Sequence, residues 1–275
     1  SEELAAWLQH LTGRSALALN SAWKPTHQAR GALVYASEDV ERLRAVLDNS
    51  FLNTATKGPP AIIKRELNLQ PLGLFSLWSA WDSRYVRDYR LVPVSTSPVT
   101  LGASGDRVAN GAWWLTPNSN QVAAQIATEA SAAGRKTLVF TQQVNFAVST
   151  ASAIASDGTT VTLNEQEQTL LTRAVQLLGD EGALYIKCRG NEVVSAALPH
   201  HSLLLSEERK LHESLYRRAD GIRTLVATST VSQGMNFPSE FVVIASDQRF
   251  DPVTNSRQRV DAHELLNAAG RAGRA

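Results

Sequence analysis

Three short apolar segments, separated by stretches with helical spacing, constrain the fold of this chain most strongly. They are KTLVFT at 136–141, IRTLVATS at 222–229 and EFVVIAS at 240–246. Continuous apolar runs of this length are typical of strands that are buried on both faces, and such strands belong to parallel sheets. The sequence therefore predicts an α/β fold in which helices cover both faces of a parallel sheet.

The segments around these strands have the spacing of amphipathic helices. Helices are predicted over 118–134, with Asn118 or Ser119 as the cap and Gly134 at the end, over 164–179, and over 206–221. The last of them has an acidic first turn and a basic last turn, which suits the helix dipole. A regular alternation of strands and helices is thus expected from about residue 119 onward.

The first 118 residues have a different character. Helices are predicted over 2–12 and 38–49, and strands over 15–20 and 32–37. Between 51 and 116 five prolines interrupt the pattern, so this part is expected to be a partly β connector. The predicted division is therefore an α/β segment at 1–50, a connector at 51–118 and the main α/β unit at 119–275.

Composition narrows the classes of protein to consider. A chain of 275 residues with 43% hydrophobic and 19% charged residues has globular composition, and no apolar run is long enough for a bilayer, so we expect a soluble protein. The single cysteine, Cys188, excludes an intrachain disulfide and favours the reducing cytoplasm. A net charge of +1 argues against an arm that holds nucleic acid by charge alone.

Polar residues follow two of the predicted strands. Thr141, Gln142 and Gln143 follow the first strand. Thr228 and Ser229 begin a stretch that continues to Gln233, Gly234 and Asn236. Ligands of open parallel sheets collect beyond the carboxyl ends of the strands, where hydroxyls and amides suit a sugar-phosphate backbone. Ordinary capping of the next helix is the alternative interpretation.

The chain ends on HELLNAAGRAGRA, residues 263–275, with Arg271 and Arg274 each preceded by glycine. On a helix these arginines would lie one turn apart and project from one face. Two guanidinium groups aimed at one target suit phosphate, because each offers planar, permanently charged donors. A solvated helix tip is the alternative.

Four blocks in a fixed order give a more specific signal. KTLVFTQQ, LPHHSLLLSEERKLHE, IRTLVATSTVSQGMNFP and HELLNAAGRAGRA together resemble the second RecA-like lobe of a superfamily 2 helicase of the DExH-box kind. The resemblance covers about residues 119–275, which stop within the sixth motif. Residues 1–50 resemble, more weakly, the end of the first lobe.

This resemblance implies roles for individual residues. Thr141 and Gln142 occupy the fourth motif and Thr228 and Ser229 open the fifth, so all four would contact the backbone of a DNA or RNA strand. The end of the fifth motif faces the nucleotide, which implies ATP-binding roles for Gln233, Gly234 and Asn236.

The sixth motif implies the catalytic residues. Arg271 and Arg274 would reach the terminal phosphate of ATP bound by the first lobe, and Gly270 would allow the backbone to approach closely. Asn267 stands where the family often has Gln or His, so its reach to the nucleotide is shorter.

The chain lacks other parts of the motor. No G-x-x-x-x-G-K-[ST] motif occurs, and the Asp180-Glu181 pair, which mimics a DExH box, is interpreted as a helix end. ATP and Mg²⁺ would be held mainly by the remainder of the first RecA-like lobe, so the parent enzyme is expected to hydrolyse ATP and this segment alone to be inactive. The alternative is a non-catalytic nucleic-acid-binding or scaffolding module. The start without Met and the stop within the sixth motif suggest a segment of a longer polypeptide.

Other candidate residues are given structural roles. Adjacent His200 and His201, with Cys188, have irregular spacing for a metal site, so no metal is predicted. Trp113 and Trp114 are interpreted as packing anchors rather than base-stacking platforms. Arg209 is expected to form an interlobe or surface salt bridge.

Overall fold

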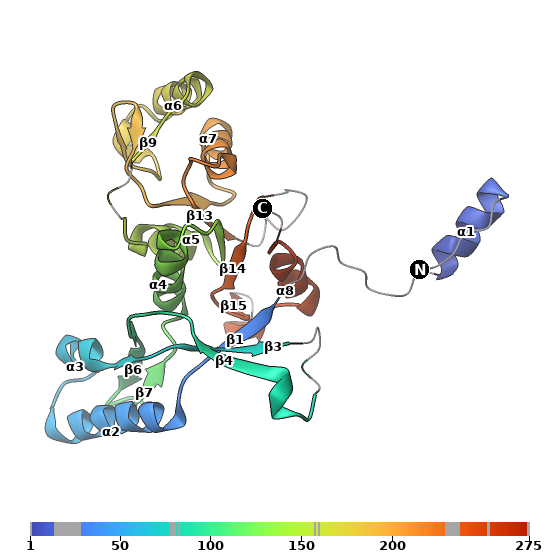
Figure 1. Ribbon diagram of the computed structural model, residues 1–275. Coiled ribbons are helices and arrows are strands. Elements are labelled where there is room, and N and C mark those ends of the chain that lie inside the picture. Colours follow the sequence, from blue (N-terminus) through green and yellow to red (C-terminus); the bar gives the residue numbers. More distant parts are fainter. Residues whose placement is uncertain are drawn as a thin grey trace.

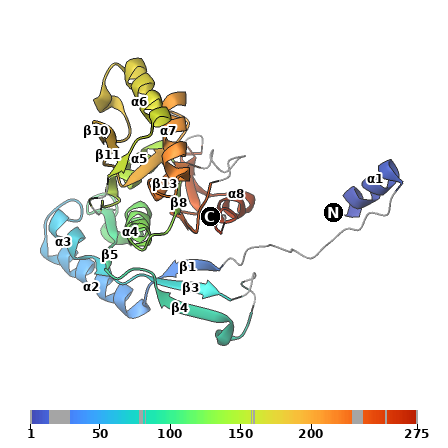
Figure 2. The ribbon, with the colours of Figure 1, turned by 45° about the horizontal axis from the view of Figure 1, so that its top comes forward.

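The computed structural model contains an α/β unit, a β-rich unit on its amino-terminal side and the separate helix α1 (Glu2–Thr12) (Figure 1). Both views place α1 away from the other two parts (Figures 1 and 2). The structure describes residues 2–13, 29–77, 81, 83–156, 158, 160–228, 237–251 and 254–273. Among them, no helix combines the length and the apolar character needed to cross a bilayer.

A four-stranded parallel sheet forms the centre of the α/β unit. Its order is β12-β13-β8-β14, and every neighbouring pair is parallel. The strands are β8 (Thr137–Thr141), β12 (Ala197–His200), β13 (Thr224–Thr228) and β14 (Phe241–Ile244). This arrangement confirms the predicted fold class, and three of its strands are the apolar segments identified from the sequence.

The fourth strand, β12, was not predicted. Its sequence ALPH contains Pro199, which cannot donate to a strand ladder and is normally confined to sheet edges. In the described part of the chain, β12 pairs only with β13 and so occupies an edge of the parallel sheet. The edge position explains how a proline-containing segment joins a parallel sheet.

Helices cover both faces of the sheet, as predicted. α4 (Ser119–Ala132) and α5 (Val144–Ala153) pack on the face to which Val139 and Val226 point. α7 (Ser206–Arg217) and α8 (Ala262–Ala269) pack on the opposite face, against Leu138 and Leu225. α6 (Glu165–Leu178) packs on α7, next to a small sheet of β9 (Val161–Thr162), β10 (Cys188–Arg189) and β11 (Glu192–Val193).

The predicted ends of two helices had different outcomes. α6 begins with a capping box between Asn164 and Glu167 and ends at Gly179, whose φ of 78° suits glycine, so the Asp180-Glu181 pair lies past the helix as predicted. At the start of α4, Asn118 has a φ of 48° and makes no capping hydrogen bond. Its side chain instead donates to the Thr100 carbonyl over 2.9 Å.

The β-rich unit spans about residues 30–116. Its largest sheet is antiparallel and pairs β3 with both β1 and β4 (Figure 1). The predicted strand at 32–37 corresponds to β1, the predicted strand at 15–20 lies outside the described residues, and the predicted helix at 38–49 lies within α2. The elements are β1 (Arg30–Val34), α2 (Ser37–Asn53), α3 (Ala61–Glu66), β2 (Asn68–Leu69), β3 (Leu72–Ser76), η1 (Val86–Asp88), β4 (Tyr89–Pro93), β5 (Val99–Thr100), β6 (Gly102–Asp106) and β7 (Ala112–Thr116).

Trp113 anchors the core of this unit. It is 5% exposed, and its ring meets that of Phe51 edge to face with centroids 5.2 Å apart. The Arg107 guanidinium lies 3.8 Å from the centre of the Phe51 ring and donates to the Phe51 and Thr54 carbonyls at the end of α2. The predicted anchor role is confirmed for Trp113, whereas Trp114 is 46% exposed and is not a core anchor.

A carboxylate joins the β-rich unit to α4. Glu129 accepts hydrogen bonds from the hydroxyl of Ser95, from the amide of Thr96 over 2.6 Å and from the amide of Ser97 over 3.4 Å. Burial opposes ionisation of Glu129, but these hydrogen bonds outweigh it and lower its pKa. Beside this junction Val99 packs on Val122 of α4, so the β-rich unit is held against the α/β unit.

Candidate functional site at the carboxyl edge of the sheet

Two threonines end neighbouring strands at the carboxyl edge of the parallel sheet. Thr141 closes β8 and Thr228 closes β13, and the two are paired in register. Thr141 is 1% exposed, and its Oγ1 has no hydrogen-bond partner among the described residues. Thr228 is 6% exposed. The strand register therefore brings both hydroxyls to one edge, just below the molecular surface.

Gln142 follows Thr141 and links two loops of this edge. Its Nε2 donates to the Ser246 carbonyl over 2.9 Å, which joins the end of β8 to the segment after β14. Its Oε1 is buried and has no hydrogen-bond partner within the described part of the chain. Gln142 is thus fixed in place while one acceptor atom is left to a ligand or to water.

An open pocket of about 530 Å³ lies beside Gln142. Residues from the β-rich unit, from the start of α4 and from the segment after β14 contribute to it. Its lining consists of Ser104, Thr116, Pro117, Asn118, Ser119, Asn120, Gln142, Gln143, Phe146, Ser246, Gln248, Phe250 and Arg257. Of these, Gln142 and Gln143 were candidates in the sequence, because they follow a predicted strand, and most of the others lie in segments that carry no recognisable motif.

A hairpin supplies one wall of the pocket. β15 (Gln248–Asp251) pairs with β16 (Ser256–Arg259), and Phe250 lies directly opposite Arg257. On the other face of the hairpin, Arg249 forms an ion pair of 3.6 Å with Glu264 of α8. The available signal for this hairpin was the turn sequence DPVTN at 251–255, because neither strand has an apolar pattern.

α8 runs from the carboxyl edge of the sheet toward the opposite edge. Glu264 and Leu265 of its first turn and Ala268 of its last turn share a small cavity with Thr141 and Ile244, the last residues of β8 and β14. The turn that follows α8 returns to the segment before β14, where the amide of Gly273 donates to the Ser239 carbonyl over 2.8 Å. α8 thus packs beside the ends of β8 and β14, and the turn after it is tied to the segment before β14.

Arg271 lies in the turn after α8. The helix ends at Ala269, so the helical projection expected for Arg271 and Arg274 is absent at Arg271. Arg271 is half-buried and Gly270, which closes the helix, lies beside it. Asn267, one turn earlier, is exposed. Gly273 has a φ of 74°, which explains why this turn contains glycine.

Several predicted site residues lie outside the described residues. They are Ser229, Gln233, Gly234, Asn236 and Arg274. The structure brings Thr141, Gln142 and Thr228 together at the carboxyl edge, and it places Arg271 with Gly270 in the turn after α8.

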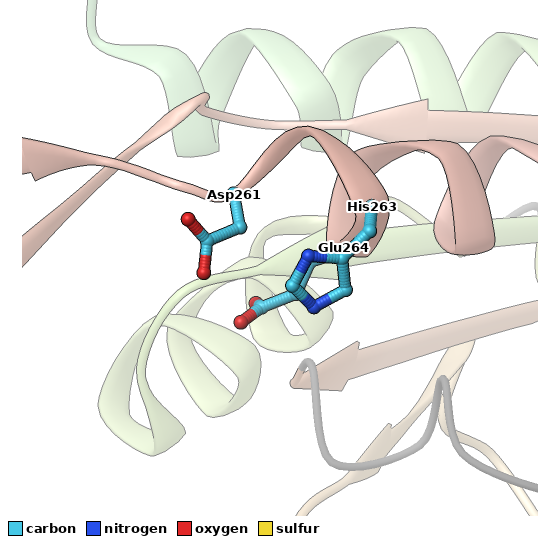
Figure 3. A group of neighbouring side chains, drawn as sticks. All are labelled: Asp261, His263 and Glu264. Atoms are coloured by element: carbon cyan, nitrogen blue, oxygen red, sulfur yellow. The ribbon is translucent and has the colours of Figure 1, made fainter.

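Three side chains near the start of α8 form a group that could be considered for a metal ion. The donor atoms of Asp261, His263 and Glu264 lie within 4.8 Å of one another (Figure 3). Asp261 and His263 are exposed, and Glu264 is already paired with Arg249. A cation would have to displace that arginine, so we assign no metal to this group.

Three histidines are buried around α7. His212 Nδ1 donates to the Pro199 carbonyl over 2.7 Å, and His200 Nε2 lies 3.1 Å from Glu213 Oε1. The ring of His201 packs edge to face on that of Tyr185, with centroids 4.7 Å apart. Burial lowers the pKa of all three histidines, that of His212 to about 3. The neutral rings are part of the core, which agrees with the structural role expected for His200 and His201.

Arg209, in the same region, forms no surface salt bridge within the described residues, and the interlobe alternative stays a prediction. Its Nη2 donates to the Leu204 carbonyl over 3.2 Å. The side chain therefore fastens the loop between β12 and α7 instead of pairing with an acid.

We expect His212→Asn to reduce the loss of stability that acid causes. His212 stays neutral in the folded state but gains a proton in the unfolded state below about pH 6.5, so it costs about 2 kcal/mol of unfolding free energy between pH 7 and pH 5. Asn keeps a donor for the Pro199 carbonyl and does not titrate. Urea unfolding at several pH values measures the slope of the unfolding free energy against pH.

The difference in slope between the wild-type protein and His212→Asn is due to His212, because buried Glu208, 3.9 Å from its Nε2, is present in both proteins. His263→Asn, at an exposed position, is the matched control and should keep the wild-type slope. An unchanged slope in His212→Asn would show that this histidine accepts protons in the folded state.

No family model matches the chain, but several known proteins are similar to parts of it. The chain is 30% identical over 167 residues to the ATP-dependent DNA helicase Hel308 of Pyrobaculum calidifontis. The matched segment covers 58% of this chain and 22% of that protein. The chain is 35% identical over 75 residues to the RQC trigger complex helicase SLH1 of Saccharomyces cerevisiae. That match covers 27% of this chain and 4% of that protein. The match to the pre-mRNA-splicing factor brr2 of Schizosaccharomyces pombe is 36% over 76 residues, 27% of this chain and 3% of that protein. The chain thus spans less than a quarter of the length of these relatives.

Proposed function

Because the chain is related to the superfamily 2 helicases of the DExH-box kind, we propose that it is the strand-binding and arginine-supplying part of an ATP-dependent helicase. Residues 119–275 are the second RecA-like lobe in this proposal, residues 1–50 are the end of the first lobe, and residues 51–118 connect them. Its partners are a strand of DNA or RNA and the remainder of the first lobe. The observation that carries the proposal is the parallel sheet, whose carboxyl edge gathers Thr141, Gln142 and Thr228.

The strand-binding part of the proposal concerns this edge. Gln142 lines the open pocket with a fixed amide, and Thr141, Thr228 and Ser229 complete the set that would contact the sugar-phosphate backbone. Hydroxyl and amide groups hold a backbone without reading its sequence. Thr141 is buried in this conformation, so its contact would need a small opening of the edge.

The nucleotide-binding part concerns the far end of α8. Half-buried Arg271 and exposed Asn267 offer a guanidinium and an amide, which are suitable donors for phosphate oxygens. The chain has no phosphate-cradling glycine loop with its lysine, so its residues fit one side of ATP only. In the proposal Arg271 and Arg274 face the terminal phosphate, and Gln233, Gly234, Asn236, Asn267 and Gly270 face the rest of the nucleotide.

The chemistry of the proposal follows from charge. When bound, ATP and Mg²⁺ supply the phosphoryl group and the metal ion that the reaction needs, and the metal is held mainly by the missing first-lobe motifs. The arginines of this chain contribute positive charge where the equatorial oxygens of the phosphoryl group become more negative.

We expect the purified chain to bind a single-stranded oligonucleotide and to hydrolyse ATP no faster than a protein-free control. Binding is measured by fluorescence anisotropy, and its affinity should fall as salt increases, because phosphate contacts release counterions. Turnover is measured with and without the oligonucleotide. Robust turnover by the chain alone would contradict the proposal that the first lobe holds the nucleotide, and absence of strand binding would contradict the strand-binding part.

A further inference from the structure

The three-stranded sheet of the β-rich unit has an open edge at β4. Its order is β1-β3-β4, and β4 pairs with β3 alone within the described residues. Both views place β4 on the side of this sheet that is turned away from the α/β unit (Figures 1 and 2). An open edge presents unpaired N–H and C=O groups, which proteins normally cover or interrupt, so it is a candidate interaction surface.

The main-chain groups at this edge follow from the hydrogen-bond pattern of the ladder. The Leu77 amide donates to the Asp88 carbonyl over 2.9 Å, so these opposed residues form a hydrogen-bonded pair. Hydrogen-bonded and non-bonded pairs alternate in an antiparallel ladder, so the main-chain groups of Arg90 and Val92 point to β3. Those of Leu91 point the other way. Leu91 therefore offers an N–H and a C=O to an additional strand.

Apolar side chains surround the open edge. Leu91 is 56% exposed, and Tyr85 and Val86, just before β4, are 63% and 88% exposed. No residue of β4 belongs to a core cluster among the described residues. Single exposed apolar residues are ordinary, but neighbouring ones beside an open strand edge are typical of a surface that a partner covers.

Arginines accompany the apolar residues at this edge. Arg84, Arg87 and Arg90 recur at every third position and are exposed, and none forms an ion pair within the part of the chain that the structure describes. Residues 83–93 contain one carboxylate, that of Asp88, which accepts a hydrogen bond from the Ser83 hydroxyl. This surplus of positive charge favours a partner that brings carboxylates.

We propose that β4 is the docking edge for an extended, acidic segment of a partner protein, which joins the sheet as an additional strand. Main-chain hydrogen bonds with Leu91 hold the segment, and its carboxylates pair with Arg87 and Arg90. In strand addition of this kind, the main chain supplies affinity and alternate side chains supply specificity. The inference goes beyond the proposed function, because the edge includes none of the residues assigned to the nucleic-acid strand or to ATP.

The sheet also indicates the side-chain pattern of such a segment. Successive side chains of a strand point to opposite faces, so Arg90 and Leu91 lie on opposite faces of the sheet. The segment's residue opposite Leu91 therefore lies beside an apolar side chain, and its two neighbours lie on the face that carries Arg90. A segment in which acidic and apolar residues alternate fits both faces.

Charge and main-chain geometry distinguish this partner from two others. A second copy of the chain, paired through its own β4, would bring three more arginines to the same patch, and like charges that face each other destabilise a ladder. A nucleic acid would pair with the arginines, but it has no strand edge to bond with Leu91 and no aliphatic side chains to cover Val86.

The test uses a fluorescein-labelled peptide of about nine residues in which glutamate alternates with valine, with binding followed by fluorescence anisotropy. We expect the 275-residue chain to bind it at least about tenfold more tightly than a peptide with lysine in place of glutamate. The valine amides face β4 in the expected pairing. Their N-methylation should weaken binding by at least about tenfold, because it removes the main-chain donors.

Charge reversal in the protein tests the arginines through a gain of binding, which misfolding does not produce. Arg87→Glu/Arg90→Glu should bind the lysine peptide in preference to the glutamate peptide. Arg65→Glu reverses a charge at an exposed position on α3 and is the matched control, so it should keep the wild-type preference.

Leu91→Pro tests the main-chain contact from the protein side. It removes the amide that faces the open edge and leaves the bonds to β3, and edge strands tolerate proline at such a position. The far-UV circular dichroism should therefore stay unchanged while the affinity for the glutamate peptide falls by at least about tenfold. Should this variant misfold, the N-methylated peptide tests the same hydrogen bonds on the wild-type chain.

Each contrary result overturns a defined statement. Equal affinity for the N-methylated and unmodified peptides would overturn strand addition, and equal affinity for the glutamate and lysine peptides would overturn the acidic partner. Displacement of the peptide by an oligothymidylate would assign the edge to nucleic acid, and a dimer that Leu91→Pro dissociates would assign it to a second copy. Absence of binding of the glutamate peptide at about 1 mM would overturn the whole inference.

Discussion

Arg271→Ala, and separately Arg274→Ala, should lower strand-stimulated ATP hydrolysis by about a thousandfold or more in a helicase that carries this chain together with a phosphate-binding loop. An arginine placed on a transferring phosphoryl group stabilises charge that develops only in the transition state, so its loss affects turnover far more than binding. Strand affinity should stay within about twofold of the wild-type value, because neither arginine is among the candidate strand contacts Thr141, Gln142, Thr228 and Ser229. Steady-state ATPase assays and anisotropy measure the two quantities.

Two further variants sharpen this experiment. Arg271→Lys keeps the charge but loses the planar, multiple donors, so it should recover only a small part of the rate. Arg217→Ala removes a half-exposed arginine on α7 and should leave turnover unchanged. Wild-type turnover in the Arg271 and Arg274 variants would defeat the assignment of these arginines to the nucleotide.

Arg218→Ala should lower the free energy of unfolding of the chain by about 3 kcal/mol or more. Arg218 Nη1 lies 2.6 Å from Oε2 of Glu167, whose side chain is fully buried. Without its partner the carboxylate keeps the Ser214 hydroxyl and the Asn164 amide, but no other cation in the described part of the chain pairs with it. An uncompensated buried charge is among the most destabilising single defects. Urea unfolding measures the change.

The neighbouring residue provides the control. Arg217→Ala removes an arginine that is half exposed and 3.7 Å from Glu213, a pair for which a change of at most about 1 kcal/mol is expected. Adding Glu167→Gln to Arg218→Ala should restore part of the loss, because the amide carries no charge. If the double variant is as unstable as Arg218→Ala, the effect comes from lost packing and the electrostatic explanation is wrong.

The parallel sheet could be predicted because three of its strands have continuous apolar sequences. KTLVFT and IRTLVATS became the central strands β8 and β13, whose burial on both faces requires that composition, and EFVVIAS became β14, which follows β8 in the strand order. β12 could not be found in the same way, since an edge strand tolerates Pro199 and a polar His200.

The candidate site was harder to predict than the sheet. Thr141, Gln142 and Thr228 could be found because a chemical rule places ligands after parallel strands. Phe146, Phe250 and Arg257 meet through tertiary packing of α5 and a hairpin, and no local pattern encodes that meeting. The spacing of Arg271 and Arg274 suggested a helix, but spacing alone does not show where a helix ends.

α8 has a mechanical consequence. Its eight residues form a rod about 12 Å long, with one end fastened to the hairpin through Glu264 and the other continuing into a turn that is tied to Ser239. A short helix compresses and stretches very little, so the two ends cannot be displaced independently along its axis. A displacement of the hairpin along this axis would therefore also move the Arg271 turn, as long as the ion pair between Arg249 and Glu264 holds.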